Sequence, residues 1–339
     1  MHWRSIFAGL AGAATILGLT ACGPAKAPAG TLVAWAYPKA AQQPLPEAPP
    51  GPQHVPGSKL TFTGAQINDG ETLVDWFPDE HPKPPAIVVQ VRKGSPPPCA
   101  ECHMITGQGF PAIPNLSGLP AAYIIQQVEE FRSGRRQSWQ HGRPATQEMI
   151  EVAKKVSDAE LAQAAAYFAA LPKAPHYRVI ETEQVPATKP NFYGWRDLVP
   201  GAAPEPIRGR VIEVSENFPL VVLNDTHTGM VDYAPKGAVT RGEALVKSGG
   251  HNGQPCAACH GADLTGMGDT PPLAGRSAAY LARMIWDIKT GARQGPAVTP
   301  MQAPAAHLNE ADITDVAAYL ASLPPAKSTV VVAQQEVAP

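Results

Sequence analysis

Two cysteines and a histidine occur twice in this chain at one fixed spacing. The two sets are Cys99, Cys102 and His103, and Cys256, Cys259 and His260. The pattern Cys-x-x-Cys-His is the attachment motif of c-type haem. In one helical turn the two thiols lie on the same face, from which they can add to the two vinyl groups of one porphyrin. The adjacent histidine is then held beside the iron as an axial ligand.

Two other interpretations of these cysteines are a disulfide within each pair and a single four-cysteine zinc site. Pairs that share a zinc ion usually lie close together in the sequence. Here Cys99 and Cys256 are 157 positions apart, and a histidine directly follows each pair. We therefore predict two covalently bound haem c groups, each with an iron ion.

The residues after the two motifs form an internal repeat. At a constant offset of 157 both copies contain Pro-x-Leu-x-Gly, then a tyrosine, then Gly-x-Arg. The matched pairs are Pro114 and Pro271, Leu116 and Leu273, Gly118 and Gly275, Tyr123 and Tyr280, Gly134 and Gly291, and Arg136 and Arg293. A five-residue insertion in the first copy then shifts the offset to 152.

A histidine-ligated haem iron either binds a second axial ligand or stays open to substrates. Methionine is that ligand in cytochromes c. Met149 and Met301 occupy matching positions of the repeat, in what we expect to be an extended loop before the last helix. We predict that both bind iron. Met104 directly follows His103, so it lies on the proximal side and cannot easily reach the opposite face.

Further repeat residues have two open interpretations. The carbonyl groups of Pro114 and Pro271 can accept a hydrogen bond from the second ring nitrogen of the proximal histidines. In one interpretation the repeated tyrosines and arginines contact haem propionates. In the other, the tyrosines pack in the core and the arginines face solvent. They are Tyr123, Tyr280, Arg136 and Arg293.

Both copies show the apolar spacing of helices. Helices are predicted over 121–133 and 278–290, with Gly134 and Gly291 as C-terminal stops. Ser157 and Asn309 are predicted N-caps of the last helices, which end at Leu-Pro pairs. The fold class is therefore mainly α, with two helical haem domains in tandem.

The start of the chain has features of export. A short basic stretch precedes an apolar run over 6–19 that is too short to span a bilayer. Residues 19–22 resemble the bacterial lipoprotein box, so we predict a signal peptide over 1–21 and a lipid on the Cys22 thiol. This lipid would anchor the protein on the periplasmic side of a membrane. Ordinary secretion to the periplasm and an uncleaved anchor remain open.

Proline is abundant, with 38 residues, and several lie between the predicted units. We expect a Pro/Ala-rich tether over 22–58. The other predicted parts are a first haem domain with an N-terminal extension (59–173), an interdomain segment (174–238), a second haem domain (239–325) and a tail (326–339). The extension should hold a short helix within 66–76. Short strands are predicted over 210–214, 220–223 and 229–233.

Each copy resembles a class I cytochrome c, and the tandem resembles dihaem cytochromes c of the c-four type. The resemblance covers residues 95–173 and 240–325 and rests on the motifs quoted above. It implies helical domains around each haem, His–Met ligation, and electron transfer from a dehydrogenase or to a terminal oxidase. The extension before Cys99 and the long interdomain segment are departures from that simple tandem.

These observations favour an electron carrier that catalyses no bond chemistry. The cytochrome subunit of a larger dehydrogenase complex is the first alternative. A dihaem peroxidase is the second, although that enzyme needs an open iron. The net charge of −2 gives no indication of a nucleic-acid partner.

Overall fold

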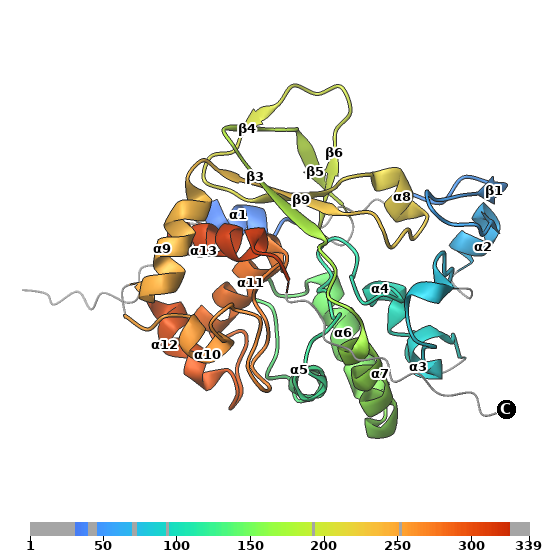
Figure 1. The fold of residues 1–339 in the computed structure, drawn as a ribbon, viewed down its shortest axis with the longest axis horizontal. Helices are drawn as coiled ribbons and strands as arrows, with labels where there is room; N and C mark the ends of the chain where they lie inside the picture. The colour runs from blue at the N-terminus through green and yellow to red at the C-terminus, as the bar shows by residue number, and fades with distance from the viewer. Residues whose placement is uncertain are drawn as a thin grey trace, which may run out of the picture.

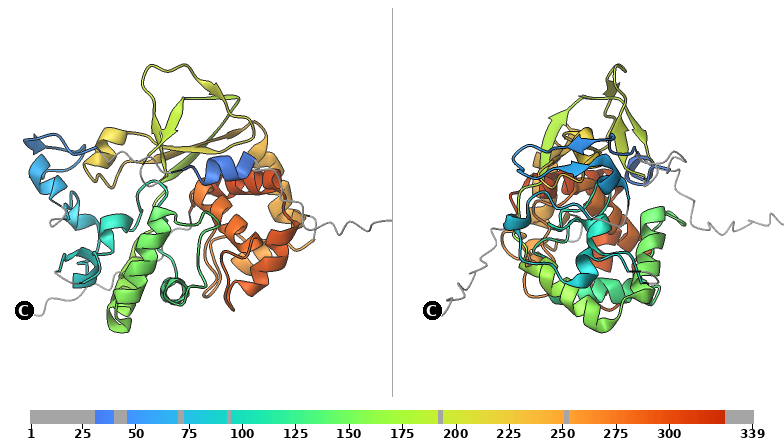
Figure 2. Two further views of the ribbon diagram at one scale, coloured as in Figure 1. Left: turned by 180° about the vertical axis from the view of Figure 1, so that it is seen from behind. Right: turned by 90° about the vertical axis from the view of Figure 1, so that its right-hand side faces the viewer.

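The structure is a computed structural model that describes residues 31–39, 46–69, 73–92, 95–191, 194–250 and 253–325 of the 339-residue chain. Two helical units lie side by side, and a segment rich in short strands covers one end of both (Figure 1). The view from behind shows the same arrangement (Figure 2). Within the described ranges, no helix is both long and apolar enough to cross a membrane.

The first helical unit is built around the face that the sequence predicts to be apolar. Ile124 and Val128 of α5 are buried against Leu161 and Phe168 of α7. The helices are α3 (Ala86–Val89), α4 (Ala100–His103), α5 (Ala121–Arg132), α6 (Pro144–Lys155) and α7 (Asp158–Ala170). The ends of α5 and α7 agree with the predicted ends to within one residue.

The second unit repeats this arrangement with a longer first helix. Its helices are α9 (Ala238–Ser248), α10 (Ala257–His260), α11 (Ala278–Lys289), α12 (Thr299–His307) and α13 (Glu310–Ser322). A β-carbon on Gly242 of α9 would lie 2.0 Å from the carbonyl oxygen of Asp315 in α13. Glycine therefore lets these two helices cross closely.

Equivalent hydrogen bonds confirm the repeat in three dimensions. The Gly118 amide donates to the Phe168 carbonyl at 2.9 Å, and Gly275 donates to Leu320 at 2.9 Å. Both glycines have positive φ, where a side chain would be strained. Ser157 and Asn309 both form capping boxes with the third residue of their helices, as predicted.

The helix that precedes the haem motif in the first copy differs from the one that sequence similarity suggests. The sequence around Leu73 and Val74 resembles that around Leu245 and Val246, yet Val74 packs in the extension. The true counterpart is α3, because the Cys99 amide bonds the Ile87 carbonyl at 3.1 Å. The Cys256 amide makes the same bond to Val246 at 3.1 Å.

The middle segment forms a three-stranded sheet in the order β3–β9–β8 and two small two-stranded sheets. Strand β3 is parallel to β9, and β8 is antiparallel to it. The elements are β3 (Tyr177–Thr182), β4 (Gln184–Val185), β5 (Thr188–Pro190), β6 (Arg196–Leu198), β7 (Glu205–Pro206), β8 (Ile212–Ser215), α8 (Phe218–Val222) and β9 (Met230–Pro235). The predicted strands over 210–214 and 229–233 correspond to β8 and β9.

The strand predicted over 220–223 is wrong, because these residues belong to helix α8. Asn217 caps this helix by accepting a hydrogen bond from the Leu220 amide at 3.4 Å. Pro219 in the first turn has the φ value that a helix needs. These local signals outweigh the β-branched residues that suggested a strand.

The tether prediction for 22–58 is wrong for the described part of that range. Helix α1 (Thr31–Ala36) packs on α11 and α13 (Figure 1). Leu32, Trp35 and Tyr37 are almost fully buried, and each large apolar side chain contributes roughly 1.5–3 kcal/mol when buried. The Tyr37 hydroxyl also donates to Asp287 at 2.6 Å. Residues 1–30, including Cys22, lie outside the described residues.

The N-terminal extension packs around Trp76, whose indole donates to the Leu223 carbonyl at 2.7 Å. Ala48 and Val55 join this cluster, so residues 46–58 belong to the extension as well. Its elements are β1 (Pro52–Gln53), β2 (Phe62–Thr63), α2 (Gly64–Asn68) and the 3-10 helix η1 (Pro78–Glu80). The predicted helix within 66–76 is limited to α2.

Two buried carboxyl groups attach the sheet to the second helical unit. Glu213 of β8 and Asp232 of β9 lie opposite each other in the antiparallel pair. Asp232 accepts from the Ala278 amide at 3.2 Å, and the Ser277 hydroxyl donates to Glu213. Burial, followed by the neighbouring Glu213 charge, raises the pKa of Asp232 well above its ordinary value.

We expect replacement of Asp232 by asparagine to flatten the pH dependence of stability. Because the folded state raises the pKa of this carboxyl, it binds the proton more tightly than the unfolded state. The stabilisation that Asp232 contributes is complete below the pKa of this group in the unfolded chain. It is lost as the pH rises towards the pKa of the group in the folded chain. One such group changes the unfolding free energy by at most about 1.4 kcal/mol per pH unit.

Denaturant unfolding of the holoprotein from about pH 5 to about pH 8 measures this slope. The exposed Asp79→Asn variant is the control and should keep the slope of the parent protein. An unchanged slope in Asp232→Asn would contradict the assignment.

Candidate cofactor sites

Each Cys-x-x-Cys-His motif forms a single helical turn with its histidine at the end. In the first copy this turn is α4, and in the second it is α10. The Nδ1 atom of His103 lies 3.0 Å from the Pro114 carbonyl oxygen, and that of His260 lies 2.9 Å from Pro271. A carbonyl only accepts, so Nδ1 carries the proton and Nε2 is the free ligand atom. The predicted proline carbonyl partners are therefore present in both copies.

Both proximal histidines are held in the neutral form that binds metal. Burial lowers the pKa of His103 to about 4, despite the hydrogen bond to Pro114. Burial also lowers the pKa of His260. A neutral imidazole offers the Nε2 lone pair to iron without first losing a proton.

The four motif cysteines are free in the structure. Burial raises the pKa of Cys99 and of Cys102 to about 12. Within the described ranges, no three Cys, His, Asp or Glu side chains gather as a metal site. The disulfide and zinc interpretations therefore find no support in this part of the chain. Free thiols followed by a histidine with an available Nε2 atom fit the covalent attachment of haem.

The methionine positions differ from the expectation of an extended loop. Met149 lies in helix α6 and Met301 in the first turn of α12. Both helices have a proline in the first turn, which fixes a helical φ there. Met149 and Cys99 both pack against the buried cluster of the first unit, and Met301 and Cys256 both pack against that of the second. Both thioethers therefore border the core of the motif in their own copy.

The two units meet through the Gly-x-Arg segments. The backbones of Arg136 and Arg293 pair antiparallel, and the Gln137 amide donates to the Ala292 carbonyl at 2.9 Å. The Gln294 amide donates to the Arg135 carbonyl at 2.8 Å. This reciprocal pattern gives the two copies an approximately two-fold relation at their contact.

The repeated arginines and tyrosines bond across this contact. Arg136 donates to the Tyr280 hydroxyl at 3.2 Å, and Arg293 donates to Tyr123 at 3.1 Å. Both guanidinium groups also donate to the side-chain oxygen of Gln127, at 2.8 and 2.7 Å. Of the two open alternatives, the one in which the arginines face solvent is wrong, because both are buried.

Sequence reasoning missed Gln127 and Arg276 at the same contact. Arg276 of the second unit donates to the Asn115 and Ser117 carbonyls of the first, at 2.8 and 3.2 Å. Their positions in the other copy hold Met284 and Leu119, so a search for repeated residues passes over both. For Gln127, which lies in α5, a polar side chain on the apolar face of the helix was the one available signal.

Comparison with known proteins identifies the family of both units. Residues 98–172 and 239–324 each match the cytochrome c family. Cytochrome c-554(548) of Halomonas halodenitrificans is 41% identical over 68 residues, which are 20% of this chain and 82% of that protein. The chain belongs to the cytochrome c family. This tandem cytochrome therefore carries covalently bound haem c and transfers electrons.

Two longer relatives cover both units of this cytochrome c. The thiosulfate dehydrogenase electron acceptor of Thiomonas intermedia is 29% identical over 237 residues, 68% of this chain and 81% of the relative. Cytochrome c4 of Pseudomonas aeruginosa is 25% identical over 231 residues, 66% of this chain and 83% of that protein.

We expect Gln127→Leu to weaken the contact between the two units of this cytochrome. The substitution removes the acceptor shared by Arg136 and Arg293, and a hydrogen bond to a charged group contributes about 1.5–3 kcal/mol. The free energy of unfolding of the holoprotein should fall by about 3 kcal/mol or more, as measured with denaturant.

The control is Gln163→Leu on the exposed face of α7, which should change stability by less than about 0.5 kcal/mol. Equal stability of the two variants would show that Gln127 does not hold the units together.

Proposed function

We propose that this protein is a dihaem electron relay in which both irons have His–Met ligation. His103 and Met149 would bind the first iron, and His260 and Met301 the second. Cys99 and Cys102, and Cys256 and Cys259, would attach the two porphyrins. The observation that supports this most strongly is the repeated bond from each proximal histidine to a proline carbonyl, at nearly equal length.

The haem supplies a one-electron couple between ferrous and ferric iron. The chain supplies a fixed histidine tautomer, an apolar enclosure and a soft thioether, which together raise the reduction potential. Because both axial positions would be filled, no site remains for peroxide. This argues against the dihaem peroxidase alternative.

The two buried arginines at the contact between the units would form ion pairs with the haem carboxylates. Neither Arg136 nor Arg293 has an acidic partner within 4 Å among the described ion pairs. Buried charges usually need a counter-charge, and a haem propionate has the chemistry to provide it. Arg136 and Arg293 would then hold a carboxylate of each haem at the same contact, which would favour electron transfer between the units.

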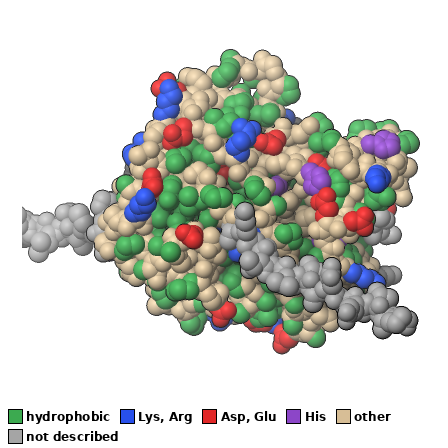
Figure 3. Space-filling model, in the orientation of Figure 1, with side chains coloured by type: hydrophobic (Ala, Val, Ile, Leu, Met, Phe, Trp, Pro, Cys, Tyr) green, Lys and Arg blue, Asp and Glu red, His purple; other side chains and the backbone are tan. Residues whose placement is uncertain are grey.

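The proposed electron donor is a periplasmic dehydrogenase and the acceptor is a terminal oxidase or another respiratory partner. The relative named as a thiosulfate dehydrogenase electron acceptor supports a donor of this class. On the face in Figure 3, Lys and Arg side chains alternate with Asp and Glu, with no large patch of one sign. No nucleic-acid partner is proposed.

A permanent subunit of a dehydrogenase complex remains the second candidate. The extension and the middle segment lie outside the two repeats and are the regions that such a partner would contact. Trp76 of the extension bonds the Leu223 carbonyl of the middle segment, and both regions cover the first unit (Figure 1). This internal packing favours the independent carrier.

Replacement of the proposed ligands by leucine, which keeps the volume and removes the sulfur, tests His–Met ligation. Met149→Leu and Met301→Leu should each remove half of the ferric methionine–iron charge-transfer band, and the double variant should remove all of it. The midpoint potential of the affected haem should fall on the order of 0.1 V. The control is Met104→Leu, which replaces a buried methionine next to His103 and should keep the full band. A full band in the double variant would refute the ligation.

We also propose that a lipid on Cys22 holds the mature chain on the periplasmic face of a membrane after removal of residues 1–21. The wild-type chain should then partition into detergent, whereas Cys22→Ser should appear in the soluble periplasmic fraction. Detergent partition of both chains would argue for an uncleaved anchor, and solubility of both would argue for ordinary secretion.

A further inference from the structure

We propose that the loop over residues 261–269, directly after the second haem motif, is a docking surface for a lysine-rich redox protein. This inference rests on the proposed electron-relay function and adds the site and the charge of the partner. It comes from a comparison of this loop with the same loop of the first copy, residues 104–112. The two loops have equal length and equivalent backbone bonds, but their surroundings differ.

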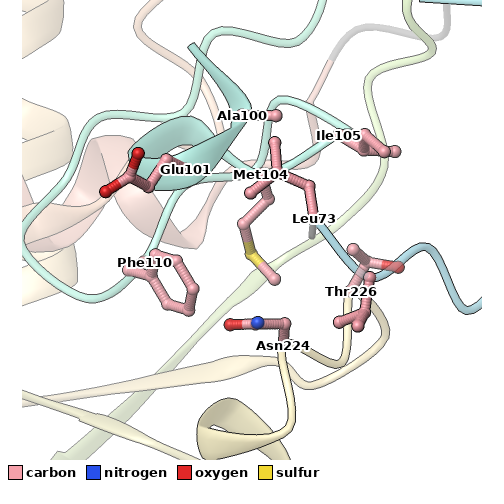
Figure 4. A pocket seen from close by; sticks show the side chains of 9 residues that line it. Leu73, Ala100, Glu101, Met104, Ile105, Phe110, Asn224 and Thr226 are labelled. Atoms are coloured by element: carbon pink, nitrogen blue, oxygen red, sulfur yellow. The ribbon is translucent and has the colours of Figure 1, made fainter. Parts of the chain in front are cut away.

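The first loop is covered by other parts of its own chain. Met104, Ile105 and Ala112 are buried. Figure 4 shows the Met104 side chain directed at Asn224 of the middle segment. Leu73 of the extension lines the same pocket. No partner protein can reach this loop without displacing these segments.

One pair of equivalent residues shows the difference most clearly. Phe110 in the first loop stacks on Trp195 of the middle segment, with 6.4 Å between ring centroids. Its counterpart, Met267, is 57% exposed and is the most exposed large apolar side chain among the described residues. The first copy thus covers this position within the chain, and the second copy leaves it open.

The second loop holds Met267 in a fixed position. The Gly266 amide bonds the His260 carbonyl at 2.9 Å. Met267 and Thr270 exchange two backbone hydrogen bonds, at 3.2 and 3.0 Å. The exposed thioether is therefore presented on an ordered turn, which lowers the entropy cost of binding. The loop begins two residues after Cys259, which would attach the second haem.

The charge of the loop indicates the charge of the partner. Asp263 and Asp269 are exposed, no Lys or Arg lies within 261–269, and neither aspartate has an ion pair in the described structure. Their counterparts in the covered loop are the uncharged Thr106 and Ala112. A lysine-rich surface would complement these charges and accelerate encounter. A second copy of the chain would present the same acidic loop and be repelled, as would an anionic membrane.

The experiment measures complex formation between the full holoprotein and a lysine-rich monohaem cytochrome c as probe. Calorimetry at low ionic strength should show Asp263→Lys/Asp269→Lys binding at least 10-fold more weakly than the parent. Carbodiimide cross-linking of the parent complex should join probe lysines to Asp263 or Asp269. Glu47→Lys/Asp79→Lys has the same change in net charge on the exposed extension, and should bind within 3-fold of the parent.

Met267→Ser separates the apolar contact from the charges. Met267→Ser should bind the probe about 3-fold more weakly than the parent, and this difference should persist in high salt. The effect of Asp263→Lys/Asp269→Lys should shrink in high salt, because salt screens exposed charges. Equal weakening by the two double variants would overturn the proposal, and so would cross-links that map only outside 261–269. Self-association of the parent that Met267→Ser abolishes would also overturn it, in favour of a second copy.

Oxidation by ferricyanide distinguishes failure of the docking site from failure of the proposed function. Ferricyanide takes one electron from each ferrous haem and becomes ferrocyanide, with no proton transferred. All reduced variants should consume two equivalents. If the parent fails this test, the electron relay is refuted, whereas normal oxidation with unchanged probe binding refutes only the docking surface.

Discussion

Two buried guanidinium groups at the contact between the helical units determine how the halves of this protein are arranged. Arg136 and Arg293 carry like charges and pair through their backbones. Such a pair is unfavourable unless other groups compensate. Gln127 accepts from both, and each arginine also bonds the tyrosine of the opposite copy. The haem carboxylates proposed for this position would complete the compensation, so cofactor binding and the association of the units depend on the same residues.

The sequence repeat does not produce a symmetric protein. The extension packs around Trp76 beside the first unit, α1 packs on the second through Leu32 and Trp35, and the middle segment contacts both. Burial and solvent access both change the potential of a haem. Two sites with the same ligand types can therefore differ in potential and in access to partners. The covered loop after His103 and the open loop after His260 show this at equivalent positions.

The middle segment is also attached to the second unit, through a pair of buried carboxyl groups at the sheet–helix contact. Glu213 and Asp232 reach the first residues of α11 from adjacent strands. Their placement at a helix N-terminus is favourable for a negative charge, but burial and the neighbouring Glu213 charge raise the pKa of Asp232. A long connection between two repeats is thus a structural part of the protein.

The sequence alone determined the features that depend on local residues. The haem motifs, the caps Ser157 and Asn309 and the helix ends at Gly134 and Gly291 were predictable because each is decided within one or two turns. The family match confirms the tandem cytochrome c fold. Tertiary contacts decided what local signals could not. They buried Leu32, Trp35 and Tyr37 of the predicted tether, formed α3 ahead of the first haem motif and turned residues 220–222 into a helix. They also brought Gln127 and Arg276 to the contact between the units, since partners more than 150 residues away leave no mark on the neighbouring sequence.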